Sequence, residues 1–345
     1  MELRLGYKKT EVGVIPEEWK TPTLDSVAKR GSGHTPDKKH PEYWDGDIKW
    51  VSLKDSDALD RVYIDETAAT ITHAGIANSS AVVHPAGTVV LSRDAGVGKS
   101  AIMKSAMAVS QHFMAWQCGP CLDNHFLYYW LQGEKSEFER IAIGNTIKTI
   151  GLPYFRALNI PLPPLPEQRA IAGALGDVDA LIGALDQLIA KKRDLKKAAM
   201  QQLLTGKKRL PGFHGKWELK RLGDVAEMGS GGTPLSSVPA YYGGDIPWIS
   251  ISDMTKGGKV ILSTDRNLTN AGFANSAAQM FPVGTVLYAM YASLGECSIA
   301  GISLCSSQAI LGIRPKDNLD KEFLYYFLTS LKPVVKAMGR MPRIA

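Results

Sequence analysis

Two stretches of this chain decide its fold, because they are copies of one another. Residues 31–55 read GSGHTPDKKHPEYWDGDIKWVSLKD, and residues 229–253 read GSGGTPLSSVPAYYGGDIPWISISD. Thirteen of the 25 positions are identical without a gap, where average composition gives roughly one or two matches. The two stretches therefore predict an internal duplication, which has to be settled before the fold is assigned.

The similarity continues on both sides of these stretches. Trp19 and Trp217 keep the offset of 198 residues, and after one deletion the offset becomes 197. The new offset aligns Phe126–Tyr129 with Phe323–Tyr326. A chain of 345 residues is also too long for one ordinary core, so two domains are expected.

The differences between the copies concentrate in polar segments. Residues 37–40 read DKKH where residues 235–238 read LSSV, and Lys99 aligns with Glu296. The identities are mostly Gly, Pro, Trp, Asp and small apolar residues, which set turns and cores. One scaffold with two polar surfaces is what a protein needs to read two versions of one kind of target.

Each copy is predicted to be a mixed α/β domain. Apolar runs bounded by turn residues indicate strands at 47–51, 87–91 and 113–117, and an amphipathic helix is expected at Asn124–Gly133. We expect a first globular domain, a long helix with a Pro-rich lead-in and a second globular domain, at residues 1–160, 161–206 and 207–345.

A long helix is predicted between the copies. The lead-in at residues 159–168, NIPLPPLPEQ, is stiff and extended, and Pro166 suits a first helical turn. About 39 residues follow before Gly206, which makes a helix of roughly 58 Å. Its apolar residues recur at alternating spacings of four and three, as in a coiled-coil seam that needs a partner. The seam, which we expect to bind that partner, consists of Ile171, Leu175, Val178, Ile182, Leu185, Ile189 and Leu195.

The net charge of +6 fits a polyanionic partner, although many other proteins are equally basic. The N-terminus has no apolar leader, and no window contains 18 apolar residues. A cytoplasmic protein without a membrane segment is therefore expected. Four cysteines do not make a disulfide framework, so free thiols are expected as well.

Two motifs suggest chemistry that the repeat argues against. Cys118 and Cys121 have the spacing of a redox pair, but Cys118 aligns with Pro315 in the other copy. Residues 96–100, GVGKS, resemble a phosphate-binding loop, but Arg93 stands where that motif needs glycine. We expect turns at both places, with an oxidoreductase as a remaining alternative. Neither a catalytic set nor a metal or cofactor site is expected.

Taken together, these features resemble the specificity subunit of a type I restriction–modification system. The resemblance covers almost all of the chain and rests on the segments 160–172, 13–19 and 203–213 and on the paired GSG-x-TP blocks. It implies that each globular unit is a target-recognition domain reading half of a bipartite sequence in double-stranded DNA. It also implies that the helix docks methyltransferase subunits, that restriction subunits join the complex, and that the partners do all the chemistry with their own cofactors.

Compared with that family pattern, the second copy ends about 56 residues early, so a truncated C-terminus without the second coiled-coil helix is expected. The first helix is then predicted to pair with another copy of itself or with a methyltransferase subunit. An alternative function is a truncated scaffold that binds partners or self-associates without reading a bipartite site.

DNA-contacting residues are expected among the polar tips. Pairs shared by the copies, such as Gln111 and Gln308, suit the scaffold or phosphates, whereas the unshared Lys38 and Lys39 suit base reading. His112, Thr146 and Lys104 are further candidates in the first copy. The expected set is Thr35, Lys38, Lys39, His40, Tyr43, Arg93, Lys99, Gln111, Asn145 and Lys148 in the first copy, and Thr233, Ser236, Tyr241, Lys256, Tyr291, Gln308 and Arg340 in the second.

Overall fold

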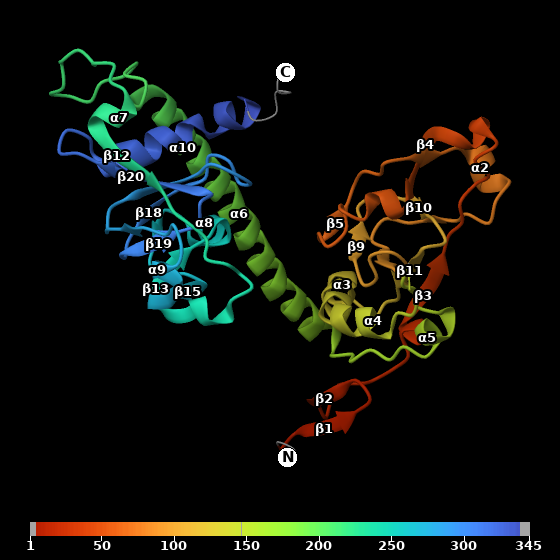
Figure 1. Ribbon diagram of the computed structural model, residues 1–345. Coiled ribbons are helices and arrows are strands. Elements are labelled where there is room, and N and C mark those ends of the chain that lie inside the picture. The colour runs from red at the N-terminus through yellow and green to blue at the C-terminus, as the bar shows by residue number, and fades with distance from the viewer. Residues whose placement is uncertain (1–4, 146, 339–345) are drawn as a thin grey trace. The chain divides into compact units, whose positions relative to one another are not determined.

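The computed structural model describes residues 5–145 and 147–338 of the chain. The chain divides into two compact units, Met1–Leu185 and Asp186–Ala345, which we call unit 1 and unit 2. Each unit contains a five-stranded and a four-stranded β-sheet and several helices (Figure 1), which confirms the predicted mixed α/β class. No helix in these described ranges is long and apolar enough to cross a membrane.

Unit 1 is built on a five-stranded and a four-stranded sheet. In spatial order, the larger sheet consists of β3 (Ala28–Ser32), β11 (Phe113–Cys118), β8 (Val89–Ser92), β9 (Ser100–Met103) and β5 (Tyr63–Ile64). The smaller sheet consists of β6 (Thr70–Ile71), β4 (Trp44–Val51), β10 (Met107–Val109) and β7 (Val83–His84). Neighbouring strands are antiparallel except for the pairs β5–β9 and β4–β10, which are parallel. A separate hairpin joins β1 (Tyr7–Thr10) to β2 (Gly13–Pro16).

Unit 2 repeats the topology of the two larger sheets strand for strand. Its larger sheet has the order β12 (Ala226–Ser230), β20 (Ile310–Pro315), β17 (Val286–Ala289), β18 (Cys297–Ala300) and β14 (Val260–Ile261). Its smaller sheet has the order β15 (Arg266–Leu268), β13 (Tyr242–Ile249), β19 (Leu304–Ser306) and β16 (Met280–Phe281). The same two positions carry the parallel pairs, β14–β18 and β13–β19. The duplication in the sequence is therefore a duplication of the fold.

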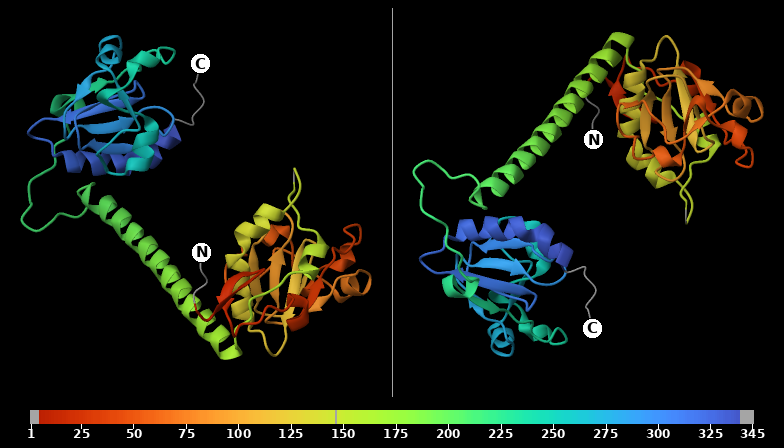
Figure 2. Two further views of the ribbon diagram at one scale, coloured as in Figure 1. Left: turned by 90° about the horizontal axis from the view of Figure 1, so that it is seen from below. Right: turned by 90° about the horizontal axis from the view of Figure 1, so that it is seen from above.

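Helices complete both units. Those of unit 1 are α1 (Leu24–Val27), η1 (Pro41–Tyr43), η2 (Leu53–Asp55), α2 (His73–Ala77), α3 (Asn124–Gly133), α4 (Lys135–Ile141) and α5 (Leu152–Arg156). Those of unit 2 are α7 (Leu222–Val225), η3 (Pro239–Tyr241), α8 (Ile251–Gly257), α9 (Asn270–Ala274) and α10 (Lys321–Met338). The predicted helix at Asn124–Gly133 is α3, which begins where the Asp123 carboxylate accepts the N–H groups of His125 and Phe126. In unit 2, α10 packs across β17, β18 and β20 (Figure 2).

The larger sheet of unit 1 separates two apolar clusters. Along β11, the alternate residues Met114 and Trp116 face the helices α3–α5, whereas Phe113 and Ala115 face the smaller sheet. This alternation follows from the pleat, which turns successive side chains to opposite faces of a strand. Trp116 and Phe113 are both fully buried. The larger sheet is therefore the middle layer of the unit, and the smaller sheet covers the face opposite the helices.

The long helix α6 runs from Leu165 to Leu203 without a break (Figure 2), which confirms the predicted length of about 39 residues. Its first turn is anchored by Gln168, which is fully buried. The Gln168 amide accepts the N–H of Asp123 at 2.8 Å and donates to the carbonyls of Cys121 and Pro163. The LPEQ segment thus belongs to the packing of unit 1.

A glycine in each copied stretch is required by a close approach of two backbones. A Cβ atom on Gly33 would lie 1.6 Å from the carbonyl oxygen of Val109, and one on Gly231 would lie 1.9 Å from that of Ser306. Val109 and Ser306 are the last residues of equivalent strands, β10 in unit 1 and β19 in unit 2. The second glycine of each GSG block is therefore fixed by sterics.

Replacing Gly33 by alanine should destabilise unit 1 by about 2 to 3 kcal/mol, because rigid backbone atoms have to move apart. Denaturant unfolding of the full chain measures the change. Gly133→Ala is the matched control, because a Cβ there meets nothing within 4 Å. Equal midpoints for the two variants would contradict the steric assignment.

His84 makes the stability of unit 1 depend on pH. Its side chain is buried, its Nδ1 has no hydrogen-bond partner, and burial lowers its pKa from the ordinary value. The unfolded chain therefore binds a proton below about pH 6.5 that the folded chain resists. Stability should fall as the pH decreases from that value, by up to about 1.4 kcal/mol per pH unit. The His84→Phe variant, which carries the residue found at Phe281, should lose this dependence in unfolding measured at pH 5 to 8; an unchanged pH profile would count against it.

Candidate nucleic-acid interface

The polar loop that follows β3 is held against the loop that follows β10. Thr35 donates its hydroxyl to Oε1 of Gln111 at 2.7 Å. The indole N–H of Trp50 donates to the carbonyl of His34 at 3.1 Å. Unit 2 repeats both contacts, with Thr233 bonded to Gln308 and the Trp248 indole bonded to a backbone carbonyl. These shared residues hold the scaffold of the polar face in both units.

A pocket of about 570 Å³ opens between these two loops in unit 1. Its floor and sides come from β4, from η2 and from the segments after β3 and β10. It brings together three of the predicted DNA-contacting residues, Thr35, Lys38 and Gln111, and also His112. The remaining lining residues are Trp44, Trp50, Ser52, Leu53, Lys54, Ala69 and Ser110.

A chain of hydrogen bonds fixes the orientation of Gln111. Its Oε1 accepts from Thr35, so its amide nitrogen faces Nε2 of His112 at 3.4 Å. The His112 Nδ1 lies 2.7 Å from a carboxylate oxygen of Asp94, and Thr149 bonds the other oxygen. This network assigns the Nδ1–H tautomer to neutral His112, with Nε2 as an acceptor. One amide N–H of Gln111 remains for a ligand.

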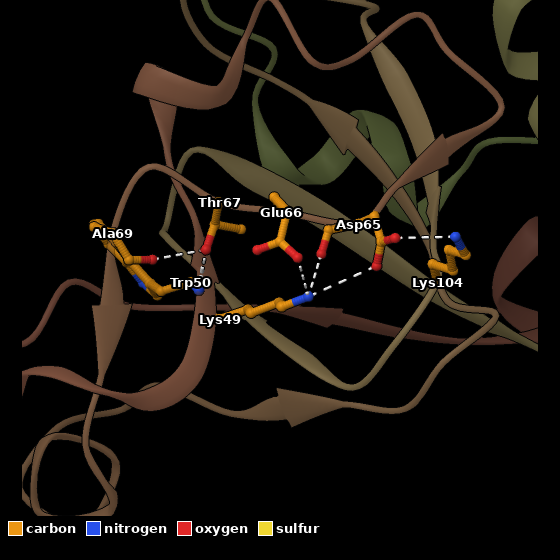
Figure 3. A network of polar contacts seen from close by, with 7 residues as sticks. All are labelled: Lys49, Trp50, Asp65, Glu66, Thr67, Ala69 and Lys104. Atoms are coloured by element: carbon orange, nitrogen blue, oxygen red, sulfur yellow. Dashed lines mark hydrogen bonds and ion pairs between the residues drawn. The ribbon is translucent and has the colours of Figure 1, made fainter.

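The wall of the pocket beside Ala69 is held by charged and polar contacts (Figure 3). Lys49 on β4 bonds the carboxylate of Glu66 at 3.0 Å and the backbone carbonyl of Asp65. Lys104 bonds the Asp65 carboxylate at 2.9 Å and thereby lowers the pKa of that group. The candidate Lys104 is therefore engaged in the scaffold.

The backbone of the same wall is tied to the strand beneath it. Trp50 donates its N–H to the Thr67 hydroxyl, which in turn donates to the carbonyl of Ala69 (Figure 3). The buried Asp55 carboxylate accepts the N–H groups of Ala68 and Ser52. The capping box of η2 and the wall of the pocket thus share one carboxylate.

Other predicted residues of unit 1 lie outside the pocket lining. His40 stacks on Tyr43 at 4.9 Å between ring centroids and bonds Glu42. Lys39 is exposed, and its backbone N–H donates to the Asp37 carboxylate.

The two candidates near the glycine-rich loop are engaged within the protein. Arg93 lies beside Asp94, with 3.5 Å between its Nε and the carboxylate. Lys99 donates to the carbonyl of Ser56 at 3.0 Å and lies 3.8 Å from Asp57.

The loop between α4 and α5 carries Asn145 and Lys148, and both are exposed. Lys148 contributes its backbone carbonyl to a bond from Ala95, which places this loop beside the glycine-rich loop. Thr146 lies outside the described residues.

In unit 2, the predicted residues are mostly exposed. Ser236 lies in the loop after β12, and Tyr241 ends η3. Lys256 pairs with Asp265 at 3.2 Å, and Tyr291 is 63% exposed. Arg340 lies outside the described residues.

Sequence reasoning missed several residues of the pocket. Trp50, Ser52 and Ser110 are identical in the two copies, so a search for unlike positions passes over them. Lys54, however, stands where unit 2 has Ser252. The same comparison of unlike positions that selected Lys38 was sufficient to select Lys54.

The predicted seam of α6 is largely solvent-exposed. Ile171 packs against the core of unit 1. The other six seam residues are between 42% and 54% exposed, namely Leu175, Val178, Ile182, Leu185, Ile189 and Leu195. Such a stripe of large apolar side chains marks an interaction surface.

The two motifs suggestive of chemistry have structural roles. Burial raises the pKa of Cys118 to about 12, which keeps it a thiol and removes the nucleophile that a redox pair needs. In the GVGKS segment, Val97 is buried in the core, and Gly98 lies against Lys135 of α4. Among the described residues, no group of three or more His, Cys, Asp or Glu side chains is placed to hold a metal ion.

Comparison with known proteins agrees with this architecture. The MjaIX specificity subunit of Methanocaldococcus jannaschii, a type I restriction enzyme subunit, is 26% identical over 268 residues, which are 73% of this chain and 61% of that protein. The putative MjaX specificity subunit of the same organism is 25% identical over 356 residues, covering 97% of this chain and 81% of that protein. This chain therefore spans about three fifths of the first relative and four fifths of the second.

The fold is also that of a solved structure, the S subunit of a type I restriction–modification system from M. genitalium. The TM-score is 0.55 at 17% identity, over 99% of this chain and 81% of that one. The family model for the type I restriction modification DNA specificity domain matches residues 16–191 and 214–341, which include most of both units. The chain therefore belongs to the family of type I restriction–modification DNA specificity proteins.

Proposed function

We propose that this chain reads a bipartite sequence in double-stranded DNA, with one half read by unit 1 and the other by unit 2. The observation that carries the proposal is the pairing of a common scaffold with unlike polar tips. Both units keep the Thr–Gln bond and the buried Trp, whereas Lys38 and His112 of unit 1 are replaced by Ser236 and Ala309. Base reading depends on side chains presented at such tips, and phosphate contacts set the register.

The proposal includes no chemistry by the chain itself. Methylation and cleavage are assigned to methyltransferase and restriction subunits, which the chain directs to its target in the cytoplasm. The high pKa of the Cys118 thiol and the scaffold role of the glycine-rich loop support this division.

Exchanging the reading segments of the two units tests the proposal. Residues 28–118 and 226–315 run from the first strand to the last strand of the larger sheet in each unit. A chimera that carries 226–315 in both places should recognise a site whose two halves have the same sequence. Methylome sequencing of a host with the methyltransferase partner gives the motif, and the wild-type chain should give two unlike halves.

The reverse chimera, with 28–118 in both places, is the control and should duplicate the other half-site. A wild-type motif that persists in both chimeras would contradict the proposal. The absence of any motif for the wild-type chain, together with intact partner binding, would favour the scaffold alternative.

We further propose that the exposed seam of α6 docks methyltransferase subunits. Ile182 and Leu185 lie on this seam and are about half exposed, so glutamate there keeps the helix but removes apolar contact. The Ile182→Glu and Leu185→Glu variants should bind the methyltransferase at least about tenfold more weakly in a titration, as expected for residues at the centre of an interface.

Gln187→Glu is the matched control, because it adds the same charge about half a turn away from Leu185. It should bind like the wild type. Equal binding by all three variants would remove the seam from the interface.

Sedimentation of the chain alone tests pairing with a second copy: a monomer at high micromolar concentration would contradict self-association.

A further inference from the structure

The lining of the unit 1 pocket consists of residues that are identical in unit 2 and of residues, here called the rim, that differ from those of unit 2. Trp50, Ser52, Ser110 and Gln111 have identical counterparts in unit 2. The rim residues differ: Lys38, Lys54 and His112 stand where unit 2 has Ser236, Ser252 and Ala309, while Ala69 stands where unit 2 has Arg266. Lys38 and Lys54 thus give the pocket of unit 1 two positive charges where unit 2 has serine, whereas Arg266 gives unit 2 one positive charge at a different position.

Both rim lysines have free ammonium groups. Within residues 5–145 and 147–338, neither Lys38 nor Lys54 forms a side-chain hydrogen bond or ion pair, although most neighbouring lysines do. Lys49, Lys99 and Lys104 are each bonded to a carboxylate or a backbone carbonyl. Lys38 and Lys54 are therefore lysines of the pocket lining whose ammonium groups remain free to bind an anion.

A buried hydroxyl at the same pocket also lacks a partner. Ser110 is 1% exposed, and its Oγ forms no hydrogen bond among the described residues. Leaving a buried hydroxyl unpaired is unfavourable, so such a group calls for a ligand or another reason. Ser110 lines the pocket together with the two lysines.

The carboxylates beside the pocket are hydrogen-bonded to other groups, and among the described residues none of them forms an ion pair with Lys38 or Lys54. The Asp55 carboxylate accepts three hydrogen bonds, from the backbone N–H and the hydroxyl of Ser52 and from the backbone N–H of Ala68. Asp94 is bonded to His112 and Thr149. The Asp37 carboxylate accepts the backbone N–H of Lys39. Each acidic group beside the pocket is thus held by other donors.

We propose that this pocket is a phosphate site, in which Lys38, Lys54 and the Ser110 hydroxyl bind one phosphodiester of the DNA backbone. The site rests on the proposed DNA-binding function and deepens it. Two ammonium groups supply the charge, and the hydroxyl and the free N–H of Gln111 supply neutral donors. Lys38 then sets the register of unit 1 on DNA, in place of the base-reading role expected for it from the sequence.

The salt dependence of binding tests this site. We would measure the affinity of the full chain, assembled with its methyltransferase, for duplexes of arbitrary sequence over a range of salt concentrations. Lys38→Ser and Lys54→Ser introduce the residues that unit 2 carries. Each should reduce the slope of log affinity against log salt by about 0.9, and the double variant by about twice that amount, equally on all sequences.

Lys9→Ser is the charge-matched control, because Lys9 is exposed on the separate hairpin β1–β2. It should keep the wild-type slope. An equal loss of slope in the control would show an effect of net charge and would overturn the assignment. Wild-type slopes in the pocket variants would overturn it as well.

Ser110→Ala separates a ligand-binding hydroxyl from a structural one. The variant should weaken DNA binding by about tenfold, as for a lost hydrogen bond to a charged group, while its melting temperature stays equal or rises. A lower melting temperature with unchanged binding would show that the hydroxyl is structural and would contradict the proposal.

Inorganic phosphate distinguishes the source of the anion. If phosphate at constant ionic strength raises the melting temperature of the wild type but not of the double variant, while the DNA slopes of the two agree, the pocket takes a free phosphate ester and not DNA. Reduced slopes in the pocket variants without any sequence preference would overturn the proposed reading function and leave the phosphate site in place.

Discussion

The polar face of unit 1 depends on the close approach of Gly33 to the carbonyl of Val109. Because Gly33 has no Cβ, the loop after β3 can cross directly over the end of β10, where a Cβ would collide with the Val109 carbonyl. That crossing brings the His34 carbonyl to the Trp50 indole and Thr35 to Gln111. The pocket is the space left between the two loops once these bonds are formed. Unit 2 repeats the glycine and the bonds, so the same steric constraint has preserved the same face in both copies while its rim changed.

Much of this architecture was predictable from the sequence, because it depends on local patterns. The duplication, the strand at 113–117, the helix α3 and the length of α6 all follow from repeats, periodicity and caps. The sequence predicted less well which polar side chains come together in the fold and which of them are already paired. Lys99 and Lys104 were candidates as well as Lys38, but they bond Ser56 and Asp65, which approach them through loops distant in the sequence. Only the folded chain shows which cations are already neutralised.

A charge difference between the two copies can also result from a different internal ion pair and not from a different ligand. Lys99 of unit 1 and Glu296 of unit 2 occupy matching positions, and their opposite charges suggest different ligands. In the structure, however, Glu296 bonds Lys332 of α10. The matching lysine of unit 1, Lys135, bonds Asp60 instead. Each unit thus gives the same helical lysine a carboxylate, but takes it from a different loop. The difference between Lys99 and Glu296 therefore accompanies a different choice of carboxylate for the helical lysine, and it need not alter what the surface recognises.

The helix α6 has an apolar seam that its sequence predicts and that remains largely exposed. The first turn is fixed by Gln168, whose amide is fully used by backbone groups of unit 1. Beyond Leu175 the apolar seam is about half exposed. Helices gain most of their stability from packing an apolar face, and an exposed seam of this length forgoes that gain. A partner that covers the seam would both bury apolar area and stiffen the helix, so docking at α6 and the stability of α6 would be coupled.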